Sequence, residues 1–217
     1  MLFFSSTLAL GPPLLLLWWT ARRYRHIGGS GRTIGVAAVL GMAGVALALL
    51  IGLLILRYLR LDTGLGSTLF RTLVLAGLVE ELSKFLVLAG IARKTSIIEN
   101  NQKSQLILVG VAVGTGFVLV ENLLFVGQAW NVLVLRTLMS VPLHTATGGL
   151  LGWALFRWRR SATSLIGLLA ASLVHGFYDL FLELGRIANF AAFAVILLAV
   201  VSLVLIARAP ADATRKP

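Results

Sequence analysis

Long apolar segments, each bounded by a short polar or basic stretch, follow one another along the whole chain. A helix needs about 20 mainly apolar residues to cross a bilayer. The pattern therefore predicts an all-α polytopic membrane protein in which residues 1–217 form a single domain. We expect about seven membrane-spanning helices, at residues 2–20, 33–57, 69–92, 106–127, 133–156, 163–183 and 187–207.

The composition supports a membrane protein and excludes several other classes. The chain is 59% hydrophobic and only 12% charged, whereas a soluble domain carries about 25% charged residues. Basic residues outnumber acidic ones by 19 to 8, but they cluster at the ends of apolar segments, which is typical of membrane topology and argues against a nucleic-acid partner. The sequence has no cysteine, which excludes disulfides and thiolate chemistry.

The distribution of lysine and arginine also predicts how the chain lies in the membrane. Basic residues favour the cytoplasmic side of a membrane protein. An N-terminus outside and a C-terminus in the cytoplasm place most of them in cytoplasmic segments and leave Arg57, Arg60, Arg71, Arg136 and Arg186 on the other side. We interpret residues 1–20 as a retained first helix, since no positive region precedes the apolar run.

A set of polar side chains interrupts the third to sixth apolar segments. Each charge in mid-membrane costs about 2.5–3.5 kcal/mol on insertion scales. With a rise of about 1.5 Å per residue, these groups fall near one level, in the outer half of the membrane. Structural bonding between helices explains an isolated pair, but a shared level predicts one site on helices 3–6, built by Glu80, Glu81, Lys84, Glu121, Asn122, His144, His175 and Asp179.

Helical spacing predicts some of the contacts within this set. His175 and Asp179 are four residues apart and share a helix face. Lys84 follows Glu80 by four residues and Glu81 by three, so it can pair with either. The two glutamates lie about 100° apart around their helix, so we expect one to meet the site and the other to meet Lys84 or a neighbouring helix.

The residue types suggest hydrolytic chemistry of two alternative kinds. Glu121, His144 and His175 are suitable zinc ligands, with Asp179 as a further ligand or an orienting group. A glutamate of the Glu80–Glu81 pair would then activate water. Without a metal, a glutamate and a histidine would activate the water, while a histidine or Asn122 stabilises the oxyanion. A serine nucleophile, for example Ser140 beside His144, is disfavoured because serines in membrane helices usually bond to backbone carbonyls.

Four short motifs in this region resemble those of the PrsW family of intramembrane proteases. Glu80-Glu81-Leu82-Ser83-Lys84 is similar to the E-E-x-x-K motif, and the segment from Phe117 to Asn122 resembles F-x-x-x-E followed by Asn. The segments His144–Gly148 and His175–Asp179 resemble H-x-x-x-G and H-x-x-x-D. Their order is kept, and they lie in predicted helices that cover about residues 69–183. The CAAX-processing and bacteriocin-processing membrane proteases are similar in turn, but they carry His at the position of Glu121.

The resemblance implies an intramembrane peptidase of a prokaryotic cell membrane, either a metalloprotease or a glutamate protease. Its substrate would be a single-span membrane protein similar to an anti-sigma factor, cut in or next to its transmembrane segment. Glu80 would activate water, with Glu121, His144 and His175 holding zinc or the oxyanion. Glu81, Lys84, Asn122 and Asp179 would support them.

Two other functions fit the same residues. A proton- or ion-coupled transporter or channel would use the buried carboxylates as a relay, although we find no inverted repeats, which are common in transporters. A non-catalytic scaffold with a protease-like fold would be expected to lack a motif residue, and none is missing.

Prolines and glycines predict how the helices pack. Pro12 and Pro13 should kink or interrupt the first helix, so that neighbouring helices must bond the carbonyls that they free. Small-residue pairs at Gly110 and Gly114, and at Gly148 and Gly152, should allow two helices to approach closely.

Overall fold

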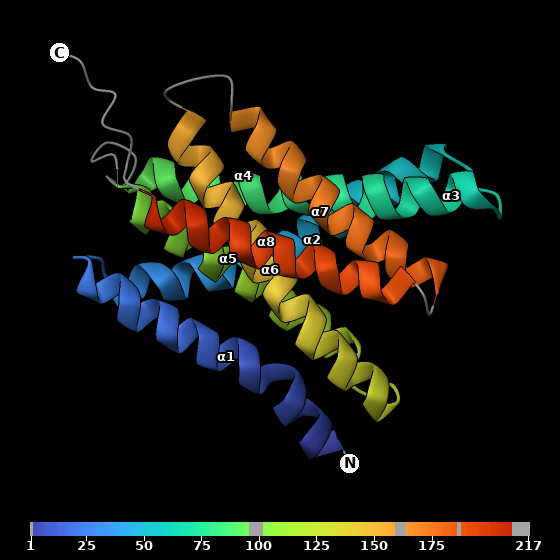
Figure 1. Ribbon diagram of the computed structural model, residues 1–217, viewed down its shortest axis with the longest axis horizontal. Helices are drawn as coiled ribbons and strands as arrows, with labels where there is room; N and C mark the ends of the chain where they lie inside the picture. Colours follow the sequence, from blue (N-terminus) through green and yellow to red (C-terminus); the bar gives the residue numbers. More distant parts are fainter. Residues whose placement is uncertain (1, 96–101, 159–163, 186–187, 210–217) are drawn as a thin grey trace.

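The computed structural model describes residues 2–95, 102–158, 164–185 and 188–209 (Figure 1). All regular structure in these ranges is helical, which confirms the all-α prediction. The elements are α1 (Leu2–His26), α2 (Gly31–Tyr58), α3 (Leu65–Leu69), η1 (Phe70–Glu80), α4 (Glu81–Lys94), α5 (Lys103–Leu124), α6 (Trp130–Trp158), α7 (Ser164–Leu184) and α8 (Ala188–Arg208).

The elements α3, η1 and α4 form one continuous rod, because the backbone stays helical at Phe70, Glu80 and Glu81, where they meet. Its middle part, η1, is a π-helix with a wider turn than the α-helices around it. Each predicted span overlaps one rod, although α5 ends at Leu124 and α6 begins at Trp130, both earlier than predicted. Of the described helices, four are long and apolar enough to cross a membrane, namely Gly31–Tyr58, Lys103–Leu124, Leu165–Leu184 and Ala188–Arg208. That the chain crosses the membrane seven times stays a prediction.

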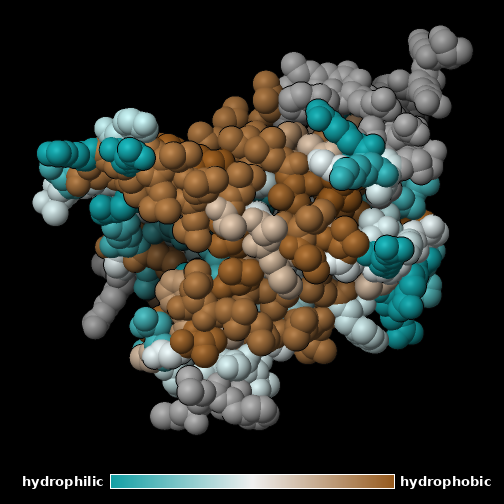
Figure 2. All heavy atoms as spheres, turned by 180° about the vertical axis from the view of Figure 1, so that it is seen from behind, coloured by the Kyte–Doolittle hydropathy of each residue, from teal (hydrophilic) through white to brown (hydrophobic). Residues whose placement is uncertain are grey.

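Successive rods run in alternating directions, so the molecule has two ends (Figure 1). At one end α1, α4, α6 and α8 finish with basic residues in their last turns; we call it the arginine-rich end. The other, which we call the α3 end, holds α3 and the loop between α5 and α6. Between them, exposed leucines and aromatic residues cover the surface, and the space-filling view shows a broad hydrophobic face bordered by hydrophilic groups (Figure 2). This surface is that of an integral membrane protein.

Helix α5 is the centre of the molecule and packs against α6, α2 and α1. The two predicted glycine pairs face each other there, as expected. A Cβ atom added to Gly114 would overlap the carbonyl oxygen of His144, and one added to Gly110 would overlap that of Gly148. The backbones of α5 and α6 therefore touch beside His144.

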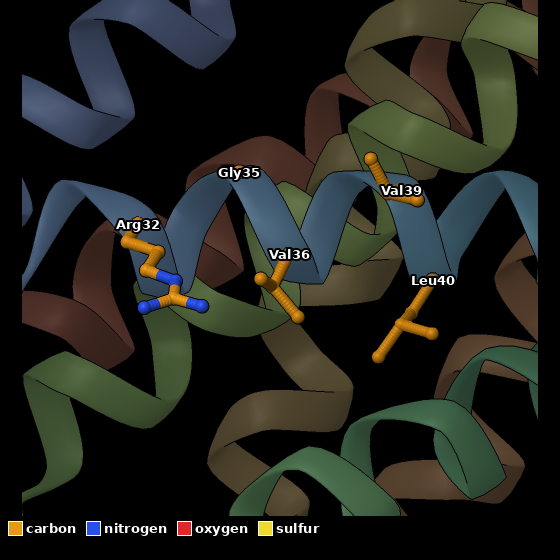
Figure 3. A pocket seen from close by; sticks show the side chains of 5 residues that line it. All are labelled: Arg32, Gly35, Val36, Val39 and Leu40. Atoms are coloured by element: carbon orange, nitrogen blue, oxygen red, sulfur yellow. The ribbon is translucent and has the colours of Figure 1, made fainter.

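One groove on the outer face of α2 carries no group suited to catalysis. Its lining is apolar except for Arg32 at one end, and Gly35 leaves it open (Figure 3). An apolar groove that ends in a cation is ordinary for a helix that faces lipid, since arginine places its charge at the interface.

Helix α1 continues through Pro12 and Pro13 and is not interrupted by them. The expected consequence for a neighbouring helix is nevertheless present. The side-chain amide Nδ2 of Asn122 on α5 donates to the carbonyl oxygen of Ala9 at 3.1 Å. Ala9 is the residue whose carbonyl Pro13, four positions later, cannot bond.

Candidate active site

Four rods bring the predicted polar residues together, as expected from the similar membrane depth that the sequence predicts for them. Glu80 is the last residue of η1, and α4 begins at Glu81. Helix α5 carries Glu121, α6 carries His144 and α7 carries both His175 and Asp179. Side chains from positions nearly one hundred residues apart lie within hydrogen-bonding distance, as Glu81 and His175 do at 2.7 Å.

The carboxylate of Glu81 is the hub of the buried part of the site. Its Oε1 accepts hydrogen bonds from Lys84 Nζ at 2.7 Å, from His175 Nδ1 at 2.7 Å and from Thr147 Oγ1 at 3.1 Å. The side chains of Glu81 and Lys84 are fully buried. Charge in such a place is tolerated only when it is paired and hydrogen-bonded, so Glu81 acts as an anchor for groups on α4, α6 and α7.

Lys84 also determines which nitrogen of His144 carries a proton. Its Nζ lies 2.7 Å from His144 Nδ1 and 4.2 Å from the centre of the Phe117 ring. An ammonium group can only donate, so Nδ1 accepts and the proton of a neutral imidazole is on Nε2. That nitrogen lies 2.7 Å from Oε2 of Glu121.

Glu121 is held from a second side by Arg136, whose NH2 group lies 3.6 Å from the same oxygen. The guanidinium carbon of Arg136 lies 3.7 Å from the centre of the Phe125 ring. The charge distribution predicts that Arg136 lies toward the outer side of the membrane, within the span predicted at residues 133–156. It lies in the second turn of α6, next to the site.

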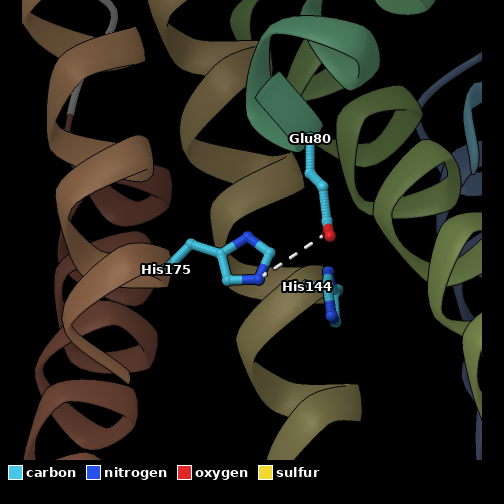
Figure 4. A group of neighbouring side chains, drawn as sticks. All are labelled: Glu80, His144 and His175. Carbon is cyan, nitrogen blue, oxygen red and sulfur yellow. Dashed lines mark ion pairs between the residues drawn. The ribbon is translucent and has the colours of Figure 1, made fainter. Parts of the chain in front are cut away.

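Glu80 is held less tightly than Glu81. Its Oε2 is buried and, like Oε2 of Glu81, makes no hydrogen bond to any described residue. His175 Nε2 lies 3.8 Å from it (Figure 4). Both glutamates thus reach the same imidazole, Glu81 at one nitrogen and Glu80 at the other. The expected contact of one glutamate with Lys84 is present, since Glu81 pairs with it. Glu81 also reaches the site, because the His175 ring extends between the two glutamates.

The site has a buried floor and one more accessible side. The side chains of Glu81, Lys84, His144 and His175 are at most 3% exposed. Those of Glu80, Glu121, Arg136 and Asp179 are 14–29% exposed. The second group therefore forms the more exposed side of the site, although Oε2 of Glu80 and of Glu121 are themselves buried, while the first group holds the geometry.

Close packing of η1 on α7 fixes the distance between Glu80 and His175. Gly77, one turn before Glu81, faces the backbone of Ser172 and Gly176. A Cβ atom at Gly77 would lie 2.6 Å from the Ser172 carbonyl oxygen and 3.0 Å from the Gly176 Cα atom. Only glycine allows this approach, and it brings the end of η1 against the turn of α7 that carries His175.

The donor set fits a metal such as zinc. Glu80, His144 and His175 each offer a ligand atom, and these atoms lie within 4.8 Å of one another. His175 donates its Nδ1 proton to a carboxylate, as metal-binding histidines usually do. Its Nε2 faces Glu80 and Asp179, at 3.8 and 3.3 Å. The lone pair on His175 Nε2 would be repelled by these two carboxylates unless a proton or a metal cation lay between the nitrogen and the carboxylate oxygens.

The structure leaves the predicted ligand set untested, but it adds detail. It groups Glu80 with the two histidines, while Glu121 approaches His144 alone. If Nε2 of His144 bound the metal, the imidazole proton would be on Nδ1. Lys84 would then have to be a neutral amine that accepts a hydrogen bond from Nδ1.

Sequence reasoning missed three contributors. Thr147 lies one turn after His144 on the same face of α6, and this spacing was the available signal. Arg136 could have been found as a charge inside an apolar segment. Phe117, quoted only as a motif letter, stacks on the His144 ring with centroids 5.6 Å apart. Ser140, the disfavoured nucleophile, lies 3.4 Å from the Tyr178 hydroxyl.

Buried carboxylates and imidazoles, arranged between membrane helices, define an integral membrane protein with the acid–base and metal-binding groups of a hydrolase. The chain belongs to the PrsW family of intramembrane metalloproteases, whose family model matches residues 30–206. The match includes every residue of the site and begins after α1. No curated protein and no solved structure matches the chain.

Proposed function

We propose that the protein hydrolyses a peptide bond in or next to the transmembrane segment of a single-span membrane protein, with Glu80 as the general base. Family membership supports an intramembrane protease. The observation that carries the assignment within the site is the inequality of the two glutamates. Oε1 of Glu81 accepts three side-chain hydrogen bonds on a fully buried side chain. Oε2 has no donor among the described residues in either glutamate, but the Glu80 side chain is 21% exposed.

Glu80 suits the activation of water. A base must have a free oxygen within reach of the proton that it takes. Glu80 has such an oxygen on the more accessible side of the site, with a side chain that is 21% exposed. Glu81 would serve by orienting His175, since a carboxylate on Nδ1 fixes the direction of the ring and leaves Nε2 facing the reacting atoms.

In a metal-free mechanism, the proton on Nε2 of His144 would stabilise negative charge that develops on the carbonyl oxygen of the substrate. It points toward the side of the site where Glu121 and Arg136 lie. Donors held rigidly in a site with little water stabilise such charge more strongly than donors in solution. Lys84 and Phe117 fix the ring in that position.

In the alternative mechanism, His144, His175 and Glu121 would hold a zinc ion in place of that proton, with Asp179 beside His175. Bound zinc makes a water ligand acidic near neutral pH and polarises a carbonyl group. Glu80 is the alternative third ligand, and in that arrangement Glu121 would be the free carboxylate.

The resemblance of the motifs and the position of the site support the substrate class that we propose. The site lies between the middle of the bundle and the α3 end, since Glu121 precedes the end of α5 by one turn. With the N-terminus outside, the α3 end faces outward, and the cut would fall in the outer half of the membrane. A single-span protein similar to an anti-sigma factor, which must be released from the membrane by cleavage, fits that position.

Comparative peptide analysis of membranes tests the proposal and identifies the substrate in the same experiment. Cells that produce the wild type, Glu80→Gln or the control Glu183→Gln would be compared. Glu183 is a carboxylate on the same α7 helix as His175, but it pairs with Arg71 at the surface. We expect one or more single-span proteins to be truncated near the membrane only with the wild type and the control. Identical membrane peptides in all three samples would refute the proposal.

A further inference from the structure

Helix α1 contacts the helix that carries Glu121 through a carbonyl that proline leaves free. Pro13 has no N–H, so the carbonyl of Ala9 lacks its partner within the helix. Both Ala9 and Pro13 are buried, and the Ala9 side chain is fully covered. Asn122 Nδ2 lies 3.1 Å from that oxygen and supplies the missing donor.

This contact lies at a weak point of α5. Asn122 and Glu121 belong to the last turn, which ends at Leu124, where helices tend to fray because the final carbonyls have no partners within the helix. Asn122 is fully buried. Its bond to α1 therefore restrains the turn that sets the position of Glu121.

We propose that Asn122 is a positioning residue, and that α1, through the carbonyl freed by Pro13, holds Glu121 in place beside His144. The inference rests on the proposed function for its catalytic consequence. It goes beyond that function because Ala9 and Pro13 lie outside the part of the chain that the family model matches, which begins at residue 30. The bundle of matched helices thus depends on a preceding helix for the geometry of its site.

The chemistry of the contact predicts an order of severity among substitutions at residue 122. The amide of asparagine donates, and its Oδ1 has no hydrogen-bond partner among the described residues. Aspartate has nearly the same shape but would set an acceptor against the Ala9 carbonyl. Leucine removes the donor without adding repulsion. Asn122→Asp should therefore be more harmful than Asn122→Leu, which is the reverse of what steric fit alone predicts.

A double-mutant cycle between Pro13 and Asn122 tests the proposal, because Pro13→Ala restores an N–H that bonds the Ala9 carbonyl within α1 and competes there with Asn122. In the cleavage assay we expect Asn122→Asp to lower kcat by roughly 10- to 100-fold, with KM nearly unchanged. Pro13→Ala and Asn122→Leu should each lower kcat, and the double variant should be no worse than the more severe single variant. Pro12→Ala is the matched control, since Pro12 is exposed and its removal leaves the Ala9 contact in place.

Melting temperatures of the same variants separate this proposal from the proposed function. Additive losses of kcat and of melting temperature, or an Asn122→Asp variant milder than Asn122→Leu, would overturn the positioning role even if the wild type cleaves. If the wild type cleaves no substrate but the melting temperatures are still non-additive, the proposed function is refuted. The docking of α1 on α5 is then still supported.

Discussion

Oε1 of Glu81 and Nδ1 of His175 lie 2.7 Å apart, although 94 positions separate the two residues in the sequence. The same oxygen accepts a bond from Lys84. This arrangement makes Glu81 the residue that joins three helices, and in the proposed mechanism it leaves Glu80 to act on water. The two adjacent glutamates therefore have different roles, and each role has its own measurable consequence.

Removal of the Glu81 charge should destabilise the fold. Glu81→Gln leaves the Lys84 ammonium buried without its counter-charge, and loss of one partner of a buried pair costs about 3–5 kcal/mol. Lys84→Met should have a cost of similar size. The variant with both substitutions should be more stable than the sum of the single effects predicts, because no unpaired charge remains. Unfolding in detergent measures all three, and strictly additive losses would show that the pair is not coupled.

The contact between α5 and α6 gives a prediction about packing. Gly114→Ala places a Cβ atom against the His144 carbonyl oxygen, so the helices must separate. Overpacking of this kind costs about 1–3 kcal/mol, and the shift of His144 should also reduce activity. Gly90→Ala is the matched control, since a Cβ atom there has no neighbour within 4 Å. Equal melting temperatures for the two variants would contradict the close contact.

Metal analysis of the purified protein should find about one zinc ion per chain. The triple variant Glu121→Ala/His144→Ala/His175→Ala should lose it. Glu80→Gln should keep the metal and lose activity if Glu80 is the base. Loss of the metal in Glu80→Gln would instead identify Glu80 as a ligand. A metal-free wild type that remains active would exclude the metalloprotease mechanism.

The absence of cysteine makes the orientation straightforward to measure. Asp62→Cys adds a single thiol at the α3 end, and Lys94→Cys adds one at the arginine-rich end; both positions are exposed. In intact cells a membrane-impermeant maleimide should label residue 62 at once and residue 94 only after permeabilisation. The reverse pattern would show that the charge bias was misread and that the site faces the cytoplasm.

Much of the fold and of the site could be predicted because membranes impose simple rules. Apolar length revealed the rods, and the cost of buried charge singled out Glu80, Glu81, Lys84, Glu121, Asn122, His144, His175 and Asp179. The need to bond the carbonyls freed by proline predicted that a neighbouring helix would contact α1, and Asn122 provides that contact.

Helix rotation and local geometry could not be predicted. The π-helix of η1 changes the direction in which Glu80 points, and an apolar sequence such as that of residues 70–79 has no signal for it. The orientation of the His175 ring, which lets both glutamates reach it, depends on Glu81 and Asp179 together. The contact of Arg136 with Glu121 could not be predicted either, because it depends on the rotation of α6.

Cleavage of a purified single-span substrate in liposomes tests the central claim most directly. The substrate identified by peptide analysis would be reconstituted with the wild type, with Glu80→Gln or with Glu183→Gln, and ion flux would be followed in parallel. We expect the wild type and Glu183→Gln to cut the substrate, and Glu80→Gln to be slower by about 10²–10⁴-fold while it melts at the wild-type temperature. Equal cleavage by Glu80→Gln, or intact substrate together with ion flux, would contradict the account.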